Sequence, residues 1–485
     1  MRYSGASAAI FMALFSVAAC SLLLWRLELI PPEALWFIGV AGALLAAGFA
    51  AVQGLKRAVR VKPKKRGMAR AASVTVDSPE RRAKVIEAFN RSAEADVPQL
   101  VDYLVQQGMA LRASDIHLVP YRDFAAVRFR VDGILTDVGQ LAGHLKDSVT
   151  NRLKVLSNLV TYIHDKPQDG RFDVSVGDRR MDLRIAFMPT LHGERVVMRL
   201  LDRAEVEFGM ENLGLTPPQL EIMTDIIMRP QGMIILTGPT GSGKTTTIYC
   251  ALRAVLRQNQ NSCSIYTLED PIEYDLLNIN QTQIEEAQGF TFEKGLRTML
   301  RQDPDVIMVG EIRDLPTAKI AIQAGMTGHL IITTVHAKGA TAVFMRLIEM
   351  GVDPPSVASA VTGVVAQRLV RVLCPSCKRP EPPTPGQEAK LGLKLSEGAI
   401  FFGPQGCDKC GMKGYAGRRG VFEILEVNEK IRTLIVDRAT PEKIQRQFIE
   451  QGTNTLGDHG LAYALKGETS LDEVIRILPL HGDYV

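Results

Sequence analysis

Residues 236–247, "LTGPTGSGKTTT", have the residue types and the spacing of a phosphate-binding loop. Glycines allow a tight turn whose backbone N–H groups face phosphate oxygens. We expect Lys244 to reach the β- and γ-phosphates of ATP, and the Thr245 hydroxyl to join the Mg²⁺ shell. The candidate nucleotide-binding residues are Gly238, Pro239, Thr240, Gly241, Ser242, Gly243, Lys244, Thr245 and Thr246.

The neighbours of this loop decide between a binding site and a glycine-rich turn without a ligand. An apolar run, "MIIL", precedes the loop, and "IYCALRAVLRQ" follows it with the spacing of a helix. That helix would direct the positive end of its dipole at the phosphates. The strand, loop and helix therefore appear in the order that a nucleotide site requires.

Acidic side chains follow two further apolar runs. "YTLEDPIEY", at 266–274, carries Glu269, Asp270 and Glu273, and "DVIMVGEIRD", at 305–314, reaches Glu311. The common form of the second motif has aspartate where Glu311 stands. Carboxylates at strand ends can hold Mg²⁺ through water or polarise an attacking water. Solvated surface acids are the alternative interpretation.

Two histidines flank the predicted strand in "TGHLIITTVHAKGA", at 327–340. His329 precedes the strand and His336 follows it. Both are candidates for sensing the γ-phosphate or for coupling it to a neighbouring subunit. Structural histidines are the alternative, because histidine alone is a weak signal.

Helices and strands alternate around these motifs. Apolar strands are predicted at 233–237, 264–268, 305–309 and 329–334, with helical segments between them, which is the order of a doubly wound parallel sheet. In the preceding region, "QLVDYLVQQGMALR" has helical spacing, while "AAVRFRVDGIL" and "DLRIAFMPT" alternate as strands do.

At 485 residues the chain should hold about two to four domains. A net charge of +4 is too small to indicate a nucleic-acid binder, and we expect no direct nucleic-acid partner. The predicted divisions are a transmembrane hairpin (1–55), a basic linker (56–80), a small α/β domain (81–205), a RecA-like P-loop core with a parallel sheet (206–373), a tetracysteine module (374–420) and a helical C-terminal region (421–485).

The N-terminal region has the pattern of a membrane hairpin. Residues 8–25 and 34–52 carry no charged side chain, and 18 helical residues span about 27 Å, close to the roughly 30 Å bilayer core. A basic cluster at 56–66 follows, which places the rest of the chain in the cytoplasm. A signal peptide, with "VAAC" at 17–20 as a processing site, and a soluble helical hairpin are the alternatives.

Four cysteines fall in two CxxC pairs, "CPSC" at 374–377 and "CDKC" at 407–410. Four thiolates suit a tetrahedral, structural Zn²⁺ site. A redox pair is the alternative, although neither motif has the setting of a thioredoxin. The predicted zinc ligands are Cys374, Cys377, Cys407 and Cys410.

These motifs, in this order, resemble the secretion ATPase family that drives type II secretion and type IV pilus assembly. "TLEDPIEY" is similar to the family's aspartate box, "RQDPDVIMVGEIRD" to its Walker B segment and "TGHLIITTVHA" to its histidine box. "SDIH", "VRFRVDG", "PQDGRF" and "HGERVVMRLLD" are similar to the domain before the motor. The resemblance covers roughly residues 100–485.

The resemblance implies a homohexamer that binds ATP at subunit contacts. It implies that Glu273 activates water and that Glu311 is the Walker B acid serving Mg²⁺. The family also uses arginines against the phosphates, because phosphoryl transfer depends on positioning and charge neutralisation. The candidates in this chain are Arg171, Arg184, Arg195, Arg297 and Arg301.

The tetracysteine module resembles that of assembly ATPases, which retraction ATPases lack, and is expected to couple the ring to an inner-membrane platform protein. We therefore expect a motor of the bacterial inner membrane with cytoplasmic catalytic domains, which assembles a pilus or a secretion pseudopilus. The hairpin stands where the family has a soluble docking domain, so this motor would anchor itself. The alternatives are a DNA-uptake, conjugation or retraction motor, and a scaffold that binds ATP without hydrolysing it.

Overall fold

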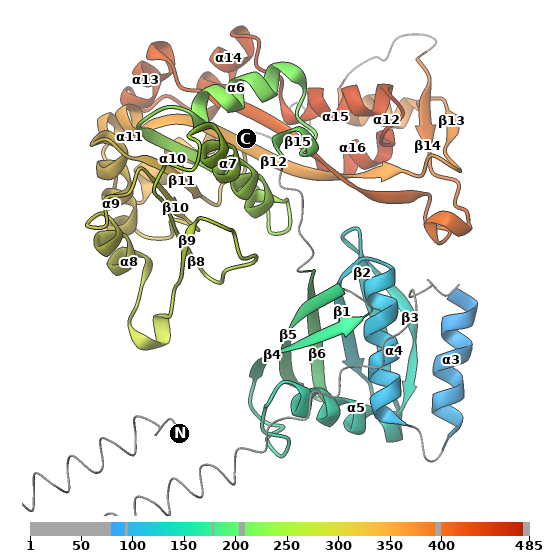
Figure 1. The fold of residues 1–485 in the computed structure, drawn as a ribbon. Helices are drawn as coiled ribbons and strands as arrows, with labels where there is room; N and C mark the ends of the chain where they lie inside the picture. The colour runs from blue at the N-terminus through green and yellow to red at the C-terminus, as the bar shows by residue number, and fades with distance from the viewer. Residues whose placement is uncertain (1–78, 93–95, 177–178, 203–208, 393–398, 479–485) are drawn as a thin grey trace, which may run out of the picture. The chain divides into compact units, whose positions relative to one another are not determined.

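The computed structural model describes residues 79–92, 96–176, 179–202, 209–392 and 399–478 (Figure 1). The expected hairpin at 1–55 lies outside these ranges, as does the expected linker except for its last two positions. Within the described ranges, no helix combines the length and the apolar character that a membrane span requires.

The first described domain is a six-stranded antiparallel sheet with the order β3-β2-β1-β6-β5-β4. The predicted strand "AAVRFRVDGIL" is a hairpin, because Asp132 and Gly133 adopt positive φ angles and reverse the chain. The elements are α3 (Pro79–Arg91), α4 (Val97–Ala110), β1 (Ala113–Pro120), β2 (Phe124–Val131), β3 (Ile134–Ala142), α5 (Gly143–Leu156), β4 (Gln168–Val176), β5 (Arg179–Thr190) and β6 (Gly193–Asp202).

The two faces of this sheet differ in chemistry. Helices α4 and α5 cover the apolar face, and Gly108 of α4 leaves room for Ile116 of β1, whose side chain lies 2.7 Å from where a Cβ would be. On the other face, residues in direct register form a charged row across five strands. The row consists of Arg171, Arg184, Arg199, Asp115 and Arg130.

The second described domain is built on a seven-stranded sheet with the order β15-β12-β7-β11-β10-β8-β9. Neighbouring strands from β12 to β9 are parallel, and β15 is an antiparallel edge strand. The strands are β7 (Gly232–Thr237), β8 (Ile265–Glu269), β9 (Asn280–Gln283), β10 (Val306–Val309), β11 (Leu330–Thr334), β12 (Val361–Leu373) and β15 (Tyr415–Glu426).

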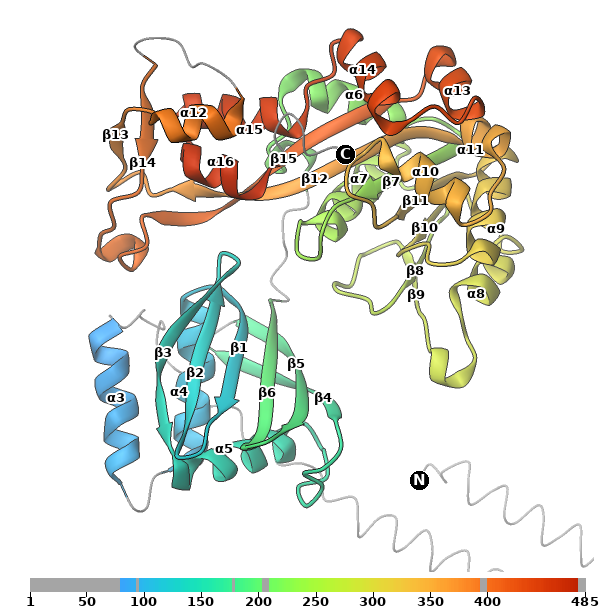
Figure 2. The same ribbon diagram turned by 180° about the vertical axis from the view of Figure 1, so that it is seen from behind.

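Helices cover both faces of this sheet, as Figure 2 shows from behind. Side chains alternate along β7, so Ile234 and Leu236 pack in a core with α7, whereas Met233 and Ile235 pack in a core with α8 to α10. This arrangement confirms the predicted doubly wound sheet. The helices of this sheet are α6 (Pro217–Ile227), α7 (Lys244–Gln258), α8 (Phe292–Met299), α9 (Leu315–Met326), α10 (Ala342–Glu349) and α11 (Pro354–Ala360).

Strands β12 and β15 continue beyond the sheet as a two-stranded ribbon that leads to the cysteines. The expected boundary at 420 falls inside β15, because this strand pairs with β12 from Tyr415 to Glu426. The helical region therefore begins at α13. The remaining elements are β13 (Arg379–Glu381), α12 (Pro385–Leu391), β14 (Phe401–Gly403), α13 (Glu429–Val436), α14 (Pro441–Glu450), α15 (Leu456–Leu465) and α16 (Leu471–Ile477).

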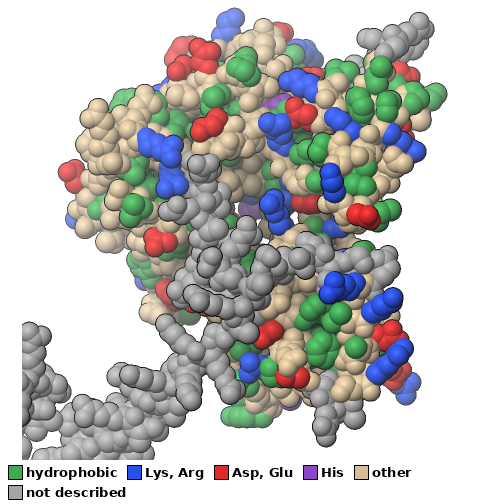
Figure 3. Space-filling model, turned by 45° about the vertical axis from the view of Figure 1, so that its right-hand side comes forward, with side chains coloured by type: hydrophobic (Ala, Val, Ile, Leu, Met, Phe, Trp, Pro, Cys, Tyr) green, Lys and Arg blue, Asp and Glu red, His purple; other side chains and the backbone are tan. Residues whose placement is uncertain are grey.

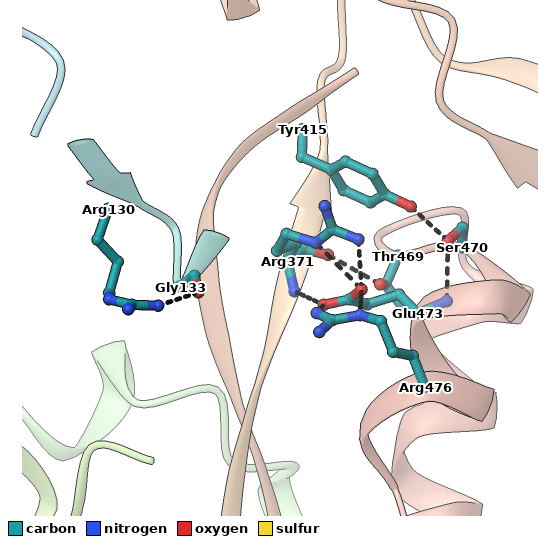
Figure 4. A network of polar contacts seen from close by, with 8 residues as sticks. All are labelled: Arg130, Gly133, Arg371, Tyr415, Thr469, Ser470, Glu473 and Arg476. Carbon is teal, nitrogen blue, oxygen red and sulfur yellow. Dashed lines mark hydrogen bonds and ion pairs between the residues drawn. The ribbon is translucent and has the colours of Figure 1, made fainter. Parts of the chain in front are cut away.

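A buried ionic network fastens α16 to this ribbon (Figure 4). The Glu473 side chain is fully buried and accepts hydrogen bonds from Arg371 Nη2 at 2.6 Å and from Arg476 Nη2 at 2.7 Å. The Arg371 guanidinium stacks 3.9 Å from the ring centroid of Tyr415, and the Tyr415 hydroxyl pairs with Ser470 Oγ at 2.7 Å. The last helix is thus held by charge as well as by packing.

The described surface carries charges of both signs. On the face that Figure 3 draws, Lys and Arg side chains are interspersed with Asp and Glu, and apolar side chains lie between them. This mixture is consistent with the small net charge of +4.

Candidate functional site

The P-loop joins the end of β7 to the start of α7, as the sequence predicts. Gly238, Gly241 and Gly243 adopt φ angles of 152°, 77° and 89°, in a region that disfavours side chains. A Cβ at Gly238 would also lie 2.5 Å from the carbonyl oxygen of Gln367, on the neighbouring strand β12. Conformation and close packing therefore both require glycine at 238.

The polar residues of the loop lie at the carboxyl edge of the parallel strands. Lys244 Nζ donates hydrogen bonds to the carbonyl oxygens of Gly238, at 2.8 Å, and Pro239, at 3.1 Å. Thr240 and Thr246 are exposed, Ser242 is buried, and Thr245 is partly buried in the first turn of α7. Burial lowers the pKa of Lys244, the Glu311 carboxylate opposes that shift, and the Arg368 guanidinium adds to it.

Glu311 follows β10 and lies at the same edge, because β10, β11 and β7 run parallel. Its side chain is 20% exposed and forms an ion pair with Arg313. His336 Nε2 lies 3.6 Å from Glu311 Oε2. The loop is fixed to β11 because Thr334 Oγ1 donates to the Gly310 carbonyl oxygen at 2.8 Å. The structure therefore brings Lys244, Glu311 and His336 together.

The three acids at and after the end of β8 occupy different environments. Asp270 is exposed, and the Glu273 side chain is 27% exposed. Glu269 is 3% exposed and is turned away from solvent into hydrogen bonds with Tyr249, Thr267 and Gln281. Asp270 and Glu273 are therefore accessible to water, and Glu269 is not.

Arg184 is the predicted arginine that contacts this region. Its Nη2 donates a hydrogen bond to the carbonyl oxygen of Ile272 at 2.6 Å, and its Nη1 lies 3.4 Å from Glu273 Oε2. Burial lowers the pKa of the Arg184 guanidinium, and the Glu273 charge opposes that shift. Arg171 is the cross-strand partner of Arg184 and is exposed.

Other predicted residues lie elsewhere. His329 precedes β11, so it lies at the amino edge of the sheet, opposite the P-loop edge, and its Nδ1 is 3.2 Å from the Ala324 carbonyl oxygen. Arg195 is exposed on β6, across from Met188. Arg297 pairs with Glu293 on the surface of α8, and Arg301 lies just after that helix.

The four cysteines converge at the end of the ribbon. Their sulfur atoms all lie within 4.8 Å of one another. The Sγ–Sγ distances are 3.9 Å for Cys374 to Cys407, and 3.8 Å for Cys377 to Cys410 and for Cys407 to Cys410. A tetrahedral ion with bonds of about 2.3 Å gives edges of about 3.8 Å, so the donor set fits one such metal ion.

Backbone amides support this cluster. The N–H groups of Cys407 and Gly414 each donate to Cys410 Sγ at 3.2 Å. Burial opposes ionisation of Cys410, but these donors outweigh it, and the pKa falls to about 7. Thiolate is the form that binds a metal ion.

Sequence reasoning missed Gln367, which is 2% exposed beneath the P-loop. Its Oε1 accepts a hydrogen bond from Thr247 Oγ1 at 2.8 Å, across 120 positions of sequence. Its Nε2 lies 2.8 Å from where a Cβ of Gly243 would be. No local pattern identifies Gln367, because its role depends on β12 lying beside β7.

Comparisons with known proteins agree with this site. The family model for type II/IV secretion system proteins matches residues 90–476. The type II secretion system ATPase E of Vibrio cholerae is 42% identical over 384 residues, which cover 79% of this chain and 76% of that protein. The type IV pilus assembly ATPase PilB of Myxococcus xanthus is 38% identical over 400 residues, which cover 82% and 70%.

Among solved structures, the ATPase DotB of Legionella pneumophila has a TM-score of 0.59 and 18% sequence identity, and the match covers 80% of this chain and 97% of DotB. At this identity the match concerns the fold alone. The sequence matches extend through both described domains and the cysteine module. The chain therefore belongs to the type II/IV secretion system protein family and is a P-loop ATPase.

Proposed function

We propose that this chain is a homohexameric motor that uses ATP hydrolysis to assemble a type IV pilus or a type II secretion pseudopilus. The observation that carries the proposal is the placement of acids at the P-loop edge of the parallel sheet: Glu311 lies beside Lys244 after β10, and Glu273, which pairs with Arg184, follows the parallel strand β8. The relative in Vibrio cholerae is named for type II secretion and the relative in Myxococcus xanthus for type IV pilus assembly, so the proposal keeps both processes.

In this proposal Lys244 and the P-loop amides bind the phosphates, and Thr245 and Glu311 hold Mg²⁺ through oxygen atoms. Glu273 orients the attacking water, and Arg184 contacts developing phosphate charge when ATP is bound. Arg171 and Arg195 remain candidates for contacts with the phosphates of the same or an adjacent subunit, and Arg297 and Arg301 remain candidates from the core. His329 and His336 remain candidates for sensing the γ-phosphate or for coupling it to the next subunit. The four cysteines hold a structural Zn²⁺.

The proposed motor acts on an inner-membrane platform protein and anchors itself through the hairpin at 1–55. The sequence of that region supports the anchor, with two uncharged runs before a basic cluster. Carbonate extraction of bacterial membranes tests it. Retention of the protein in the pellet is the expected result, and its release into the supernatant would contradict the anchor.

The function is tested in the native host with a chromosomal Glu311→Gln substitution at normal protein level. Surface filaments are imaged and secreted proteins are assayed in the culture fluid. Loss of filaments identifies a pilus motor, and loss of secreted enzymes with pili intact identifies a secretion motor. Extra filaments would point to retraction, and no change in either assay would favour a scaffold or a DNA-transfer motor.

A further inference from the structure

We propose that Tyr249, Glu269 and Gln281 form a positioning network, which fixes the loop that carries Glu273 relative to the P-loop helix. The inference rests on the proposed role of Glu273 in orienting water. Tyr249 and Gln281 are not among the predicted site residues, and Glu269, the first acid of "EDPIEY", is assigned here to positioning rather than to Mg²⁺.

Glu269 is the centre of the network. It ends β8 and is 3% exposed. Its carboxylate accepts hydrogen bonds from donors on α7, β8 and β9. Thr267 Oγ1 donates to Oε1 at 2.6 Å, Gln281 Nε2 donates to the same oxygen at 2.9 Å, and the Tyr249 hydroxyl donates to Oε2. A buried carboxylate requires such donors, so removing one of them disturbs the others.

Tyr249 connects this carboxylate to the P-loop. It lies on α7, the helix that starts at Lys244, and is fully buried. Its ring packs edge-on against Tyr274, with centroids 6.2 Å apart and planes at 78°. Burial, and next the Glu269 charge, raise the pKa of the Tyr249 phenol, so the hydroxyl keeps the proton that it donates.

Gln281 connects the carboxylate to the chain just after Glu273. Its Nε2 donates to the Tyr274 carbonyl oxygen at 3.0 Å, and its Oε1 accepts from the Leu276 N–H at 2.7 Å. One amide group thus holds both ends of the short segment that follows Glu273. The backbone at Glu273 is therefore held by Gln281 on one side and by the bond from Arg184 to Ile272 on the other.

The network contacts Glu273 through the backbone and not through the proposed phosphate site. A loosened loop would misplace the carboxylate, and small misplacements of a reacting group cost up to roughly 100-fold in rate. The P-loop itself has separate support from Gln367. Loss of the network should therefore lower kcat and leave nucleotide affinity nearly unchanged.

The test compares Tyr249→Phe with Tyr266→Phe in the full chain. Each removes one hydroxyl, but that of Tyr266, on the same strand as Glu269, donates only to the Gln302 carbonyl oxygen at 3.4 Å. We expect Tyr249→Phe to lower kcat roughly 10-fold or more, with an unchanged Kd for a fluorescent ATP analogue. Tyr266→Phe should match the unmodified chain. An unchanged kcat in a folded Tyr249→Phe protein would overturn the network. So would a loss of affinity for the ATP analogue as large as the loss in kcat.

Gln281→Ala supplies a second variant, because Gln281 is only partly buried whereas Tyr249 is fully buried, so it removes less packed side chain. The same fall in kcat at constant Kd is expected. Normal turnover in a folded Gln281→Ala protein would contradict the network, even if Tyr249→Phe failed to fold.

A double-mutant cycle shows whether the network acts through Glu273. If it does, adding Tyr249→Phe to Glu273→Gln causes no further loss of the residual rate. If the fold losses in kcat of the two single variants multiply in the double variant, Tyr249→Phe has a general structural effect, and the proposal is overturned. If Glu273→Gln alone keeps the full kcat, Glu273 does not orient the attacking water, and the proposed role of this residue is wrong. A fully active Tyr249→Phe beside an inactive Glu273→Gln would overturn only the network.

Discussion

The sulfur atoms of Cys374 and Cys407 lie 3.9 Å apart although the two residues are 33 positions apart in sequence. Because the other two cysteines complete a compact cluster with them, we predict about one Zn²⁺ per chain. Elemental analysis of the purified chain should find this metal, and Cys407→Ser should lose most of it. Cys263→Ser, at a free cysteine outside the cluster, is the control. A chain without zinc would contradict the metal assignment.

Removal of the zinc should also loosen the end of the β12–β15 ribbon. Cys374 directly follows β12, and its N–H donates to the Gly414 carbonyl oxygen at 2.9 Å. Metal binding free energy contributes to folding at such sites. Limited proteolysis near 374–410 should therefore accelerate after chelation, and an unchanged cleavage pattern would show that the module folds without the ion.

The contact of Arg184 with Glu273 predicts a defect in turnover rather than in binding. Arg184→Ala removes the ion pair and the bond to the Ile272 carbonyl oxygen, so kcat should fall roughly 100-fold while nucleotide affinity changes little. Arg128→Ala is the matched control, because Arg128 lies on the same sheet and pairs with the exposed Asp137. Turnover at the unmodified rate would remove Arg184 from the mechanism.

The pKa of Glu473 predicts how the stability of the C-terminal region depends on pH. Burial raises the pKa of this carboxyl, but hydrogen bonds from Arg371 and Arg476 outweigh it, so the pKa lies below its ordinary value of 4.5. A carboxyl with a lowered folded-state pKa stabilises the protein above its unfolded-state pKa, and this contribution is lost as the pH falls through the folded-state value.

Glu473→Gln should therefore lower the free energy of unfolding by about 3 kcal/mol at pH 7, because it leaves the Arg371 charge without its buried partner. The difference from the unmodified chain should shrink as the pH falls below 4.5. Urea unfolding at several pH values measures it. Glu468→Gln, which breaks a partly exposed pair with Arg419, should cost about 1 kcal/mol or less. Equal effects of the two substitutions would contradict the special role of the buried network.

The sequence predicted four strands of the seven-stranded sheet, β7, β8, β10 and β11, because each is a short apolar run beside a motif, and it did not predict β9, β12 or β15. Ile234 and Leu236 face one helical layer, and Met233 and Ile235 face the other. Both faces of β7 are therefore buried, so this strand appears in the sequence as a continuous apolar run. The P-loop, the acids and the cysteines were also found, since chemistry fixes their spacing. The match of the family model confirms the resemblance on which their roles rest.

Long-range pairings could not be predicted in this way. Gln367 lies beneath the P-loop only because β12 pairs with β7, and the residue has no local signature. Glu269 ends β8 and Glu273 follows it by four positions, yet one is buried in a network and the other reaches solvent. His329 and His336 flank one strand, and the direction of that strand places them at opposite edges of the sheet. Only the tertiary structure distinguishes the environments of the two glutamates and of the two histidines.

The most direct test of the central claim is phosphate release by the purified full chain with Mg²⁺ and ATP. Glu273→Gln and Glu311→Gln should each lower kcat roughly 100-fold or more while the chain still binds a fluorescent ATP analogue. Glu293→Gln, on the surface of α8, should keep the unmodified rate. Unchanged phosphate release in both acid variants would contradict the assignment of ATP hydrolysis to this edge of the sheet.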